Sequence, residues 1–453
     1  MRTFHGTSLL DDAKLALELA PALTPEGLEE RPEFFAGFSA QPAILAKGLL
    51  AVADVAQTRY FQPMPVSVRD PICTANGDRL RFEAYSACNT VAVRLDLLAG
   101  AFDGGDIRHG TTNVDINPPL RDALTRMTPA DLLHLQVGAD ELRLSTLEDT
   151  HVERKVELPE RWLKALGSEQ ELTHGLELIG EASAVHTRQF LASLPAGNSR
   201  KGQWAISRLG VKNALRPGKG SVYAEGVHRL RAARRLAPHI TGMRVYGQPG
   251  ADKCASVWEF SLPHGRISFT LTPEHYRGFS GEGALLRKLA SSTALNDGAS
   301  VAMCLTFEPR INVEEIARTT GLNVQRVGEG LAVLASDGRV GFDLFEGAYF
   351  HRELPSDAAR IEKTNPRLKN ARRLIEQGAV RPFDGHPGVF RVQGESNDYI
   401  VRTNPSSCTC PWWREHQGSR GVCKHVLAVE ILTSSESQSD PGLVDSETTD
   451  TGN

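Results

Sequence analysis

Three cysteines and one histidine near the C-terminus have the residue types and the spacing of a metal site. The stretch SCTCPWWREHQGSRGVCKHVLAVEIL contains Cys408-x-Cys410, twelve intervening residues and then Cys423-x-His425. Three thiolates and one imidazole complete a tetrahedral shell for zinc, and soft sulfur ligands favour zinc over magnesium or calcium. Because four protein ligands leave no position for a catalytic water, we expect one structural zinc ion.

The local sequence predicts how these ligands are positioned. Cys408 and Cys410 end a strand, where residues two apart point the same way, and Cys423 and His425 begin a helix. Glycines in the loop between the two pairs let the chain return over the metal.

Three other interpretations of these residues remain open. A Cys408–Cys410 disulfide would be strained at this spacing. Cys423, beside a lysine and a histidine, has neighbours that would suit a redox or catalytic thiol, although this leaves the first pair unexplained. His416 is a competing ligand in the middle of the spacer.

The order CxC, variable spacer and CxH resembles the SWIM zinc finger. The hairpin VFRVQ–GESN–DYIVR before the ligands and the helix after them also resemble its ββα layout, over residues 383–433. SWIM domains are implicated in binding DNA or proteins, so the resemblance implies a zinc-dependent binding module. The layout of the whole chain is similar to bacterial SWIM-family proteins that accompany MoxR-type AAA+ ATPases and von Willebrand A-type proteins, which implies such proteins as partners.

Aromatic and basic side chains are the candidates for contacts with nucleic acid. Within the finger they are Trp412, Trp413, Arg414, Arg420 and Lys424, although we expect at least one tryptophan to pack on the finger's own core. Residues 200–235 hold ten Lys and Arg against one acid, and the candidates chosen from this basic segment are Arg231, Arg234 and Arg235. A solvated surface explains the same charges.

The remainder of the chain predicts an α+β, multi-domain protein with an antiparallel body. Period-two stretches such as DRLRFEAYS and TVAVRLDL, joined across residues 86–89, predict hairpins, and PPLRDALTRM predicts a helix. The order strands, helix, strands resembles one repeat of a DNA sliding clamp.

A winged-helix-like segment is predicted for residues 309–356, from a helix, a turn, a second helix and two short strands. The second helix, residues 323–336, is expected to expose Asn323, Gln325, Arg326, Glu329 and the following Asp337. One base and two acids make this helix a poor partner for phosphate.

The sequence therefore predicts a chain of several different domains and segments. We predict an N-terminal helical segment (1–65), an α+β unit (66–160), a second α+β unit with the basic segment (161–308), the winged-helix-like segment (309–356), a linker helix (357–382), the zinc finger (383–433) and a disordered acidic tail (434–453).

Composition and motifs exclude several classes of protein. The 453 residues carry a formal net charge of −4, and no stretch is long and apolar enough to span a membrane. Without a signal peptide, the scattered thiols predict a reducing, cytoplasmic location. Because P-loop, HExxH and GxSxG motifs are missing, we expect a non-enzymatic adaptor. The alternative is a nucleic-acid-processing enzyme, which would need Asp96, Asp103, Asp106 and Asp115 to converge in the body.

Overall fold

The structure is a computed structural model of the chain. Among the residues it describes, no helix has both the length and the apolar character needed to cross a membrane. The described residues are 9–11, 14–16, 22–24, 27–29, 33–61, 71–113, 115–147, 149–155, 160–197, 201–279, 284–291, 293–352, 354, 365–394, 397–418 and 421–439.

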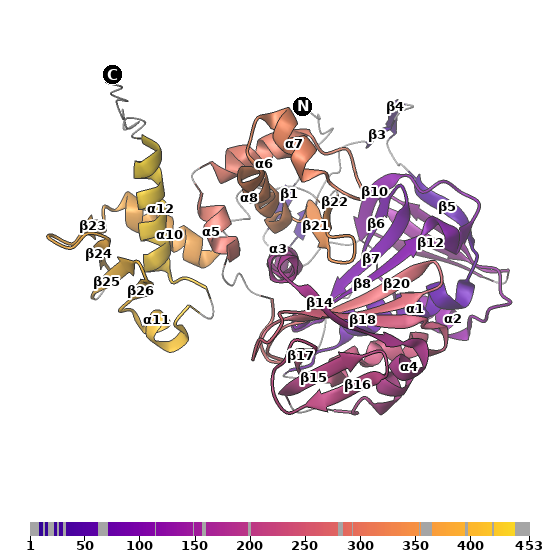
Figure 1. Cartoon of the computed structure of the whole chain (residues 1–453). Coiled ribbons are helices and arrows are strands. Elements are labelled where there is room, and N and C mark those ends of the chain that lie inside the picture. The colour runs from indigo at the N-terminus through magenta and orange to yellow at the C-terminus, as the bar shows by residue number, and fades with distance from the viewer. Residues whose placement is uncertain are drawn as a thin grey trace, which may run out of the picture.

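An eight-stranded antiparallel sheet forms the centre of the α+β body (Figure 1). The hairpin predicted across residues 86–89 is confirmed, since Arg79–Tyr85 (β7) pairs with Val91–Leu98 (β8). β8 also pairs with Gly265–Leu271 (β20), which joins the two α+β units into one sheet. The other strands are β6 (Ile72–Asn76), β10 (His109–Asn113), β14 (Glu177–Ser183), β18 (Gly242–Gly247) and β19 (Ser256–Leu262).

A five-stranded sheet and a group of helices complete the body. The helix Pro42–Gln57 (α1) begins with a proline, whose fixed φ suits the first turn, and packs on β7 and β8. Helix Pro118–Arg126 (α2) is capped by Asn117. The second sheet runs β13 (Thr150–Arg154), β12 (Glu141–Ser145), β11 (His134–Gly138), β5 (Glu33–Ser39) and β9 (Phe102–Asp103).

The prediction of an N-terminal helical segment (1–65) holds for α1, but the other described elements there are strands. Leu9–Asp11 (β1) pairs with Lys14–Ala16 (β2), and Ala22–Thr24 (β3) pairs with Gly27–Glu29 (β4). β5 is a strand as well. Short apolar runs do not distinguish helix from strand by periodicity, and here pairing with a neighbouring strand decides the outcome.

The basic segment is divided among several elements. Lys201–Ser207 (β15), Gly210–Ala214 (β16) and Ser221–Glu225 (β17) form a three-stranded sheet, and Val227–His239 (η2) is a 3-10 helix. η2 lies against α1 and against Ala184–Ser193 (α4). The described bases of this segment are therefore spread over several elements, while Arg200 lies outside the described residues.

Residues 309–356 show the predicted order of elements, while their identity as a winged helix stays a prediction. Val313–Thr320 (α7) and Val324–Ser336 (α8) begin at asparagine caps, and Val340–Asp343 (β21) pairs with Ala348–His351 (β22). Most of α8 is buried, because it packs against Ala294–Met303 (α6) and Glu160–His174 (α3). Asp337, which was expected to be exposed, is buried too.

A buried ionic network joins the β21–β22 hairpin to the eight-stranded sheet. Arg81 of β7 lies 2.6 Å from Asp96 of β8 and 2.6 Å from Asp343 of β21. Arg266 of β20 also lies 2.6 Å from Asp343. Burial alone would raise the pKa of Asp343, yet these arginines hold it below its usual value. The hairpin is thus fixed to the sheet by opposite charges that have left water.

A second part of this network surrounds Phe350 of β22. Arg352 pairs with Glu83 at 2.5 Å, and Arg94 pairs with the same carboxylate at 3.1 Å. The guanidinium of Arg81 lies 3.6 Å from the centre of the Phe350 ring. β7 therefore has no solvated face, although its alternating sequence is typical of a half-buried strand.

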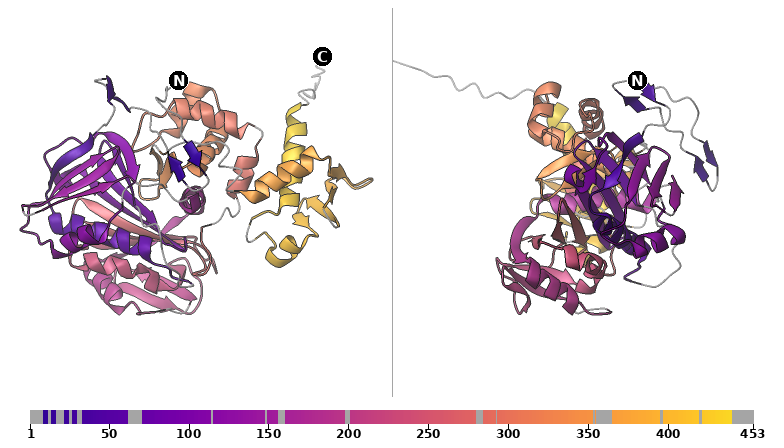
Figure 2. Two further views of the ribbon diagram at one scale, coloured as in Figure 1. Left: turned by 180° about the vertical axis from the view of Figure 1, so that it is seen from behind. Right: turned by 90° about the vertical axis from the view of Figure 1, so that its right-hand side faces the viewer.

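The C-terminal elements form a separate module beside the body (Figures 1 and 2). Its four-stranded sheet contains β23 (Val380–Pro382), β24 (Val389–Gln393), β25 (Asp398–Thr403) and β26 (Ser406–Cys408). The helices are α10 (Pro366–Glu376), α11 (Pro411–His416) and α12 (Lys424–Ser439). Ala284–Ala290 (α5) contributes leucines to its core.

Two domain boundaries therefore change. α10, predicted as a linker helix, contributes Leu368, Ala371 and Leu374 to the core of the module. α12 continues to Ser439, so residues 434–439 are helical and not part of a disordered tail. The rest of the predicted tail, 440–453, lies outside the described residues.

We expect Asp343→Ala to lower the free energy of unfolding by about 3 kcal/mol, because it leaves two buried guanidinium groups without this carboxylate. Urea unfolding followed by circular dichroism measures this loss. Asp384→Ala, at an exposed acid in the C-terminal module, is the control and should change stability by about 0.5 kcal/mol or less. Equal free energies of unfolding for the two variants would show that the buried Asp343 ion pairs do not stabilise the fold.

Glu259 of β19 should make the stability depend on pH. Burial raises its pKa to about 7, against the opposing charge of Arg266. The folded chain thus holds a proton that the unfolded chain releases near pH 4.5, so stability should fall as the pH rises from about 4.5 to 7. Glu259→Gln should remove this component, so the wild-type-minus-variant difference in unfolding free energy should be more positive at pH 5 than at pH 7.5. Parallel stability curves for the two proteins over this range would contradict the assignment.

Candidate metal centre

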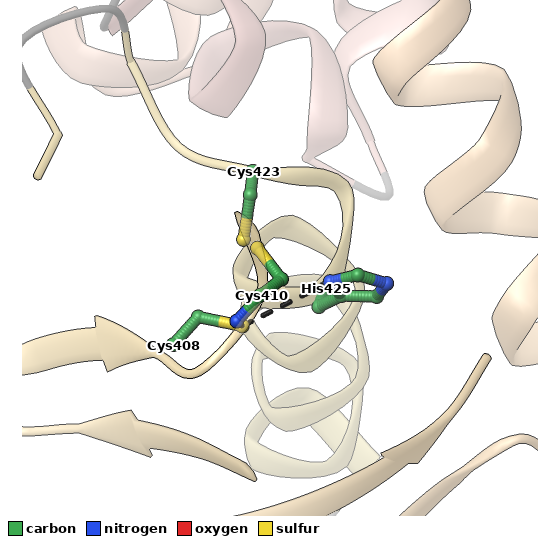
Figure 3. Close-up of side chains that lie close together, drawn as sticks. All are labelled: Cys408, Cys410, Cys423 and His425. Carbon is green, nitrogen blue, oxygen red and sulfur yellow. Dashed lines mark hydrogen bonds between the residues drawn. The ribbon is translucent and has the colours of Figure 1, made fainter. Parts of the chain in front are cut away.

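The structure brings the four predicted ligands together. The ligand atoms of Cys408, Cys410, Cys423 and His425 all lie within 4.8 Å of one another, and all four side chains are buried (Figure 3). Sγ of Cys408 lies 3.8 Å from Nδ1 of His425. A tetrahedral zinc with Zn–S bonds of about 2.3 Å has ligand-to-ligand edges of roughly 3.8 Å. The donor set and its spacing therefore fit one zinc ion.

Each cysteine lies where a strand or a helix begins or ends. Cys408 is the last residue of β26, and Cys410 is the N-cap of α11 with a proline directly after it. Cys423 directly precedes α12, and His425 lies in the first turn of that helix. Two of the three sulfurs thus sit at helix N-termini, where the backbone dipole favours negative charge.

Backbone amides donate to all three sulfurs. Cys408 Sγ accepts from the N–H of Cys410, Cys410 Sγ from Trp413, and Cys423 Sγ from Val426, each at 3.4 Å. Three thiolates and Zn²⁺ leave one net negative charge in a buried site. These donors compensate that charge, which makes the site suitable for a thiolate-rich structural ion.

The clustered thiols shift one another's pKa in opposite directions. Hydrogen bonds with Cys410 and Cys423, together with burial, raise the pKa of Cys408 above its ordinary value. Hydrogen bonds with Cys408 and Cys423 lower the pKa of Cys410. A divalent cation removes this conflict, because a coordinated thiol is held in its deprotonated form.

The zinc ligands are part of the module's core. Tyr399 of β25 stacks on the His425 ring with 4.4 Å between ring centres. The three cysteines pack with Val392, Val401 and the apolar residues of α10 and α12. Because the ligands belong to this core, metal binding and the folding of the module are coupled.

The other finger candidates lie around this centre, and their role in nucleic-acid binding stays a prediction. Trp412 is half-buried, with the guanidinium of Arg367 4.8 Å from its ring centre and His416 packed on its edge. Trp413 is half-buried too, Arg414 is exposed on α11, and Lys424 is half-buried at the start of α12. Arg420 lies outside the described residues.

The candidates from the basic segment make contacts within the body. Arg234 donates to the carbonyls of Leu191 and Leu194 at the end of α4. Arg231 donates to the carbonyl of Ala196, and Arg235 pairs with Asp54 of α1 at 2.5 Å. These contacts give each arginine a structural role within the body. Whether the arginines bind nucleic acid stays a prediction.

The aspartates of the enzyme alternative do not meet. Asp96 is buried among arginines, Asp103 and Asp106 are exposed, and Asp115 lies near Glu153, whose pKa is raised to about 7 by burial and by that neighbour. In the part of the chain that the structure describes, the Cys₃His group is the one cluster of three or more side chains that could hold a metal.

These features define a structural Cys₃His zinc finger. Residues 390–433 match the family model of the SWIM zinc finger, so the C-terminal module contains a SWIM finger. The match covers this module and does not extend to the α+β body.

Two broader comparisons add no assignment for the body. No curated protein matches the chain. The chain is similar to a solved structure of proliferating cellular nuclear antigen from Entamoeba histolytica, with 12% identity, 54% of this chain and 100% of that chain covered, and a TM-score of 0.36. A similarity at this level supports no conclusion, so the clamp-like body stays a prediction.

Cys410→Ser should abolish zinc binding, because it removes one thiolate ligand from a closed shell. Native mass spectrometry should find one zinc per wild-type chain and none in the variant. Cys304→Ser, at a free cysteine outside the finger, is the matched control and should retain one zinc. Metal-replete wild-type protein without zinc would contradict the assignment.

Proposed function

We propose that this protein is a zinc-dependent, non-enzymatic adaptor whose SWIM finger binds nucleic acid or a protein partner. The observation that carries the proposal is the closed, buried Cys₃His group, which has four protein ligands and no position for substrate. A zinc ion held in this way stabilises a binding surface and takes no part in a reaction. The match of residues 390–433 to the SWIM finger supports the same function.

The charge of the module favours nucleic acid as the first partner. Residues 365–433 contain ten Lys and Arg against six Asp and Glu, an excess of four positive charges in a chain whose net charge is −4. Local positive charge attracts phosphate, and the attraction weakens with salt as counterions are released. Protein partners are the second possibility, and MoxR-type AAA+ ATPases and von Willebrand A-type proteins are the ones suggested by the layout of the chain.

The placement of the four aspartates supports binding over the enzyme alternative. Asp96 is paired with Arg81 and Arg266 in the buried network, whereas Asp103 and Asp106 are exposed. We therefore propose binding as the function and assign no catalytic residue.

An affinity pull-down of the tagged full-length chain, with and without nuclease, tests this proposal. We expect the wild type and Cys304→Ser to retain nucleic acid that nuclease removes, and Cys410→Ser to lose it because its finger is unfolded. Protein partners whose recovery survives nuclease would support the second possibility. Equal recovery by Cys410→Ser would contradict a role for the finger, as would the absence of any retained partner at low salt.

A further inference from the structure

The four-stranded sheet of the finger module has one buried face and one open face. Phe390, Val392, Val401 and Cys408 are buried on the side that packs against α12. Since successive side chains of a strand point to opposite faces, the residues between them lie on the other face. That face lies on the side of the module away from the body (Figures 1 and 2).

The strand register arranges this open face in three rows, one of which pairs Gln393 with Asp398. Arg381 of β23 lies directly opposite Arg391 of β24, which in turn lies opposite Ile400 of β25. In the next row, Val389 lies opposite Arg402, and the amide of Phe383 donates to the carbonyl of Val389. The three arginines are exposed, and Phe383 is 39% exposed. We call these residues the outer face of the finger sheet.

Two arginines in directly opposed positions cost the sheet stability. Like charges in such a cross-strand pair repel each other, and Arg402 adds a third positive charge in the adjoining row. Asp398 is the one nearby acid with a described ion pair to them, at 2.6 Å from Arg391. An anion bound across the rows would relieve the repulsion that remains.

An aromatic pair adjoins the arginines. Phe383 and His386 lie in the β23–β24 connection with 5.4 Å between their ring centres. Exposed rings beside arginines suit a nucleobase, whose face can stack on an aromatic side chain while its phosphate meets a guanidinium. The bases of a duplex are already stacked within the helix, so this combination favours a single strand.

We infer that the outer face of the finger sheet binds single-stranded nucleic acid, with the three arginines on the phosphates and Phe383 stacked on a base. This inference rests on the proposed function and assigns it a surface and a substrate class. The face does not include the zinc ligands, so it can be altered while the finger stays folded.

Fluorescence anisotropy of the full-length protein with a labelled single-stranded 20-mer, over a series of salt concentrations, tests this inference. Replacing Arg381, Arg391 and Arg402 by alanine should reduce the slope of log K against log salt by about 2, at roughly 0.7 per lost phosphate contact. Phe383→Ala should weaken binding about tenfold with the slope unchanged, because stacking releases no counterions. The matching duplex should bind more weakly than the single strand.

The control replaces three exposed arginines of the body, Arg126, Arg154 and Arg188, by alanine. It should keep both the affinity and the slope, and all variants should retain one zinc per chain. If the wild type binds and the outer-face variant keeps its affinity and slope, this inference fails while the proposed function stands. If the wild type binds no nucleic acid but binds an acidic peptide of residues 434–453, both the nucleic-acid assignment and this inference fail.

Discussion

Three thiolates cannot share a buried site without a divalent cation, and the C-terminal module is organised around that requirement. The last residue of β26, the cap of α11 and the first turn of α12 meet at one point because each supplies a ligand. Amide donors to all three sulfurs and the Tyr399 ring on His425 fit the same centre. The inner face of the sheet packs against the ligand cluster and α12, which leaves the opposite face, with its arginines, open.

The module is connected to the body through α5. Leu285, Leu286 and Leu289 belong to the core that contains the zinc ligands, and Ala332 and Val333 of α8 belong to it too. Arg287 pairs with Glu430 of α12, and Lys288 pairs with Glu171 of α3. The core around the metal ligands therefore extends to α8. The β21–β22 hairpin that follows α8 is held on the large sheet by buried ion pairs.

Local patterns predicted local features correctly, and failed where distant residues decide the environment. The β7–β8 hairpin and α2 followed from alternation and a proline start. Arg234 was expected on a basic surface, yet it caps α4 by bonds to carbonyls forty or more residues away. Asp96 was considered for a metal cleft, and arginines from β7 and β20 surround it instead. A charge pattern does not specify which charges meet.

The sequence by itself determined the zinc site, since a short-range spacing of four ligands and the flanking elements are sufficient to define a tetrahedral shell. Only the tertiary structure decided what the other charges do. The polar side of β7 became a buried ionic layer because a hairpin more than 240 residues away covers it. Arg381 and Arg391 became neighbours because strand pairing fixed their register. Both outcomes depend on contacts between distant segments, which no local pattern records.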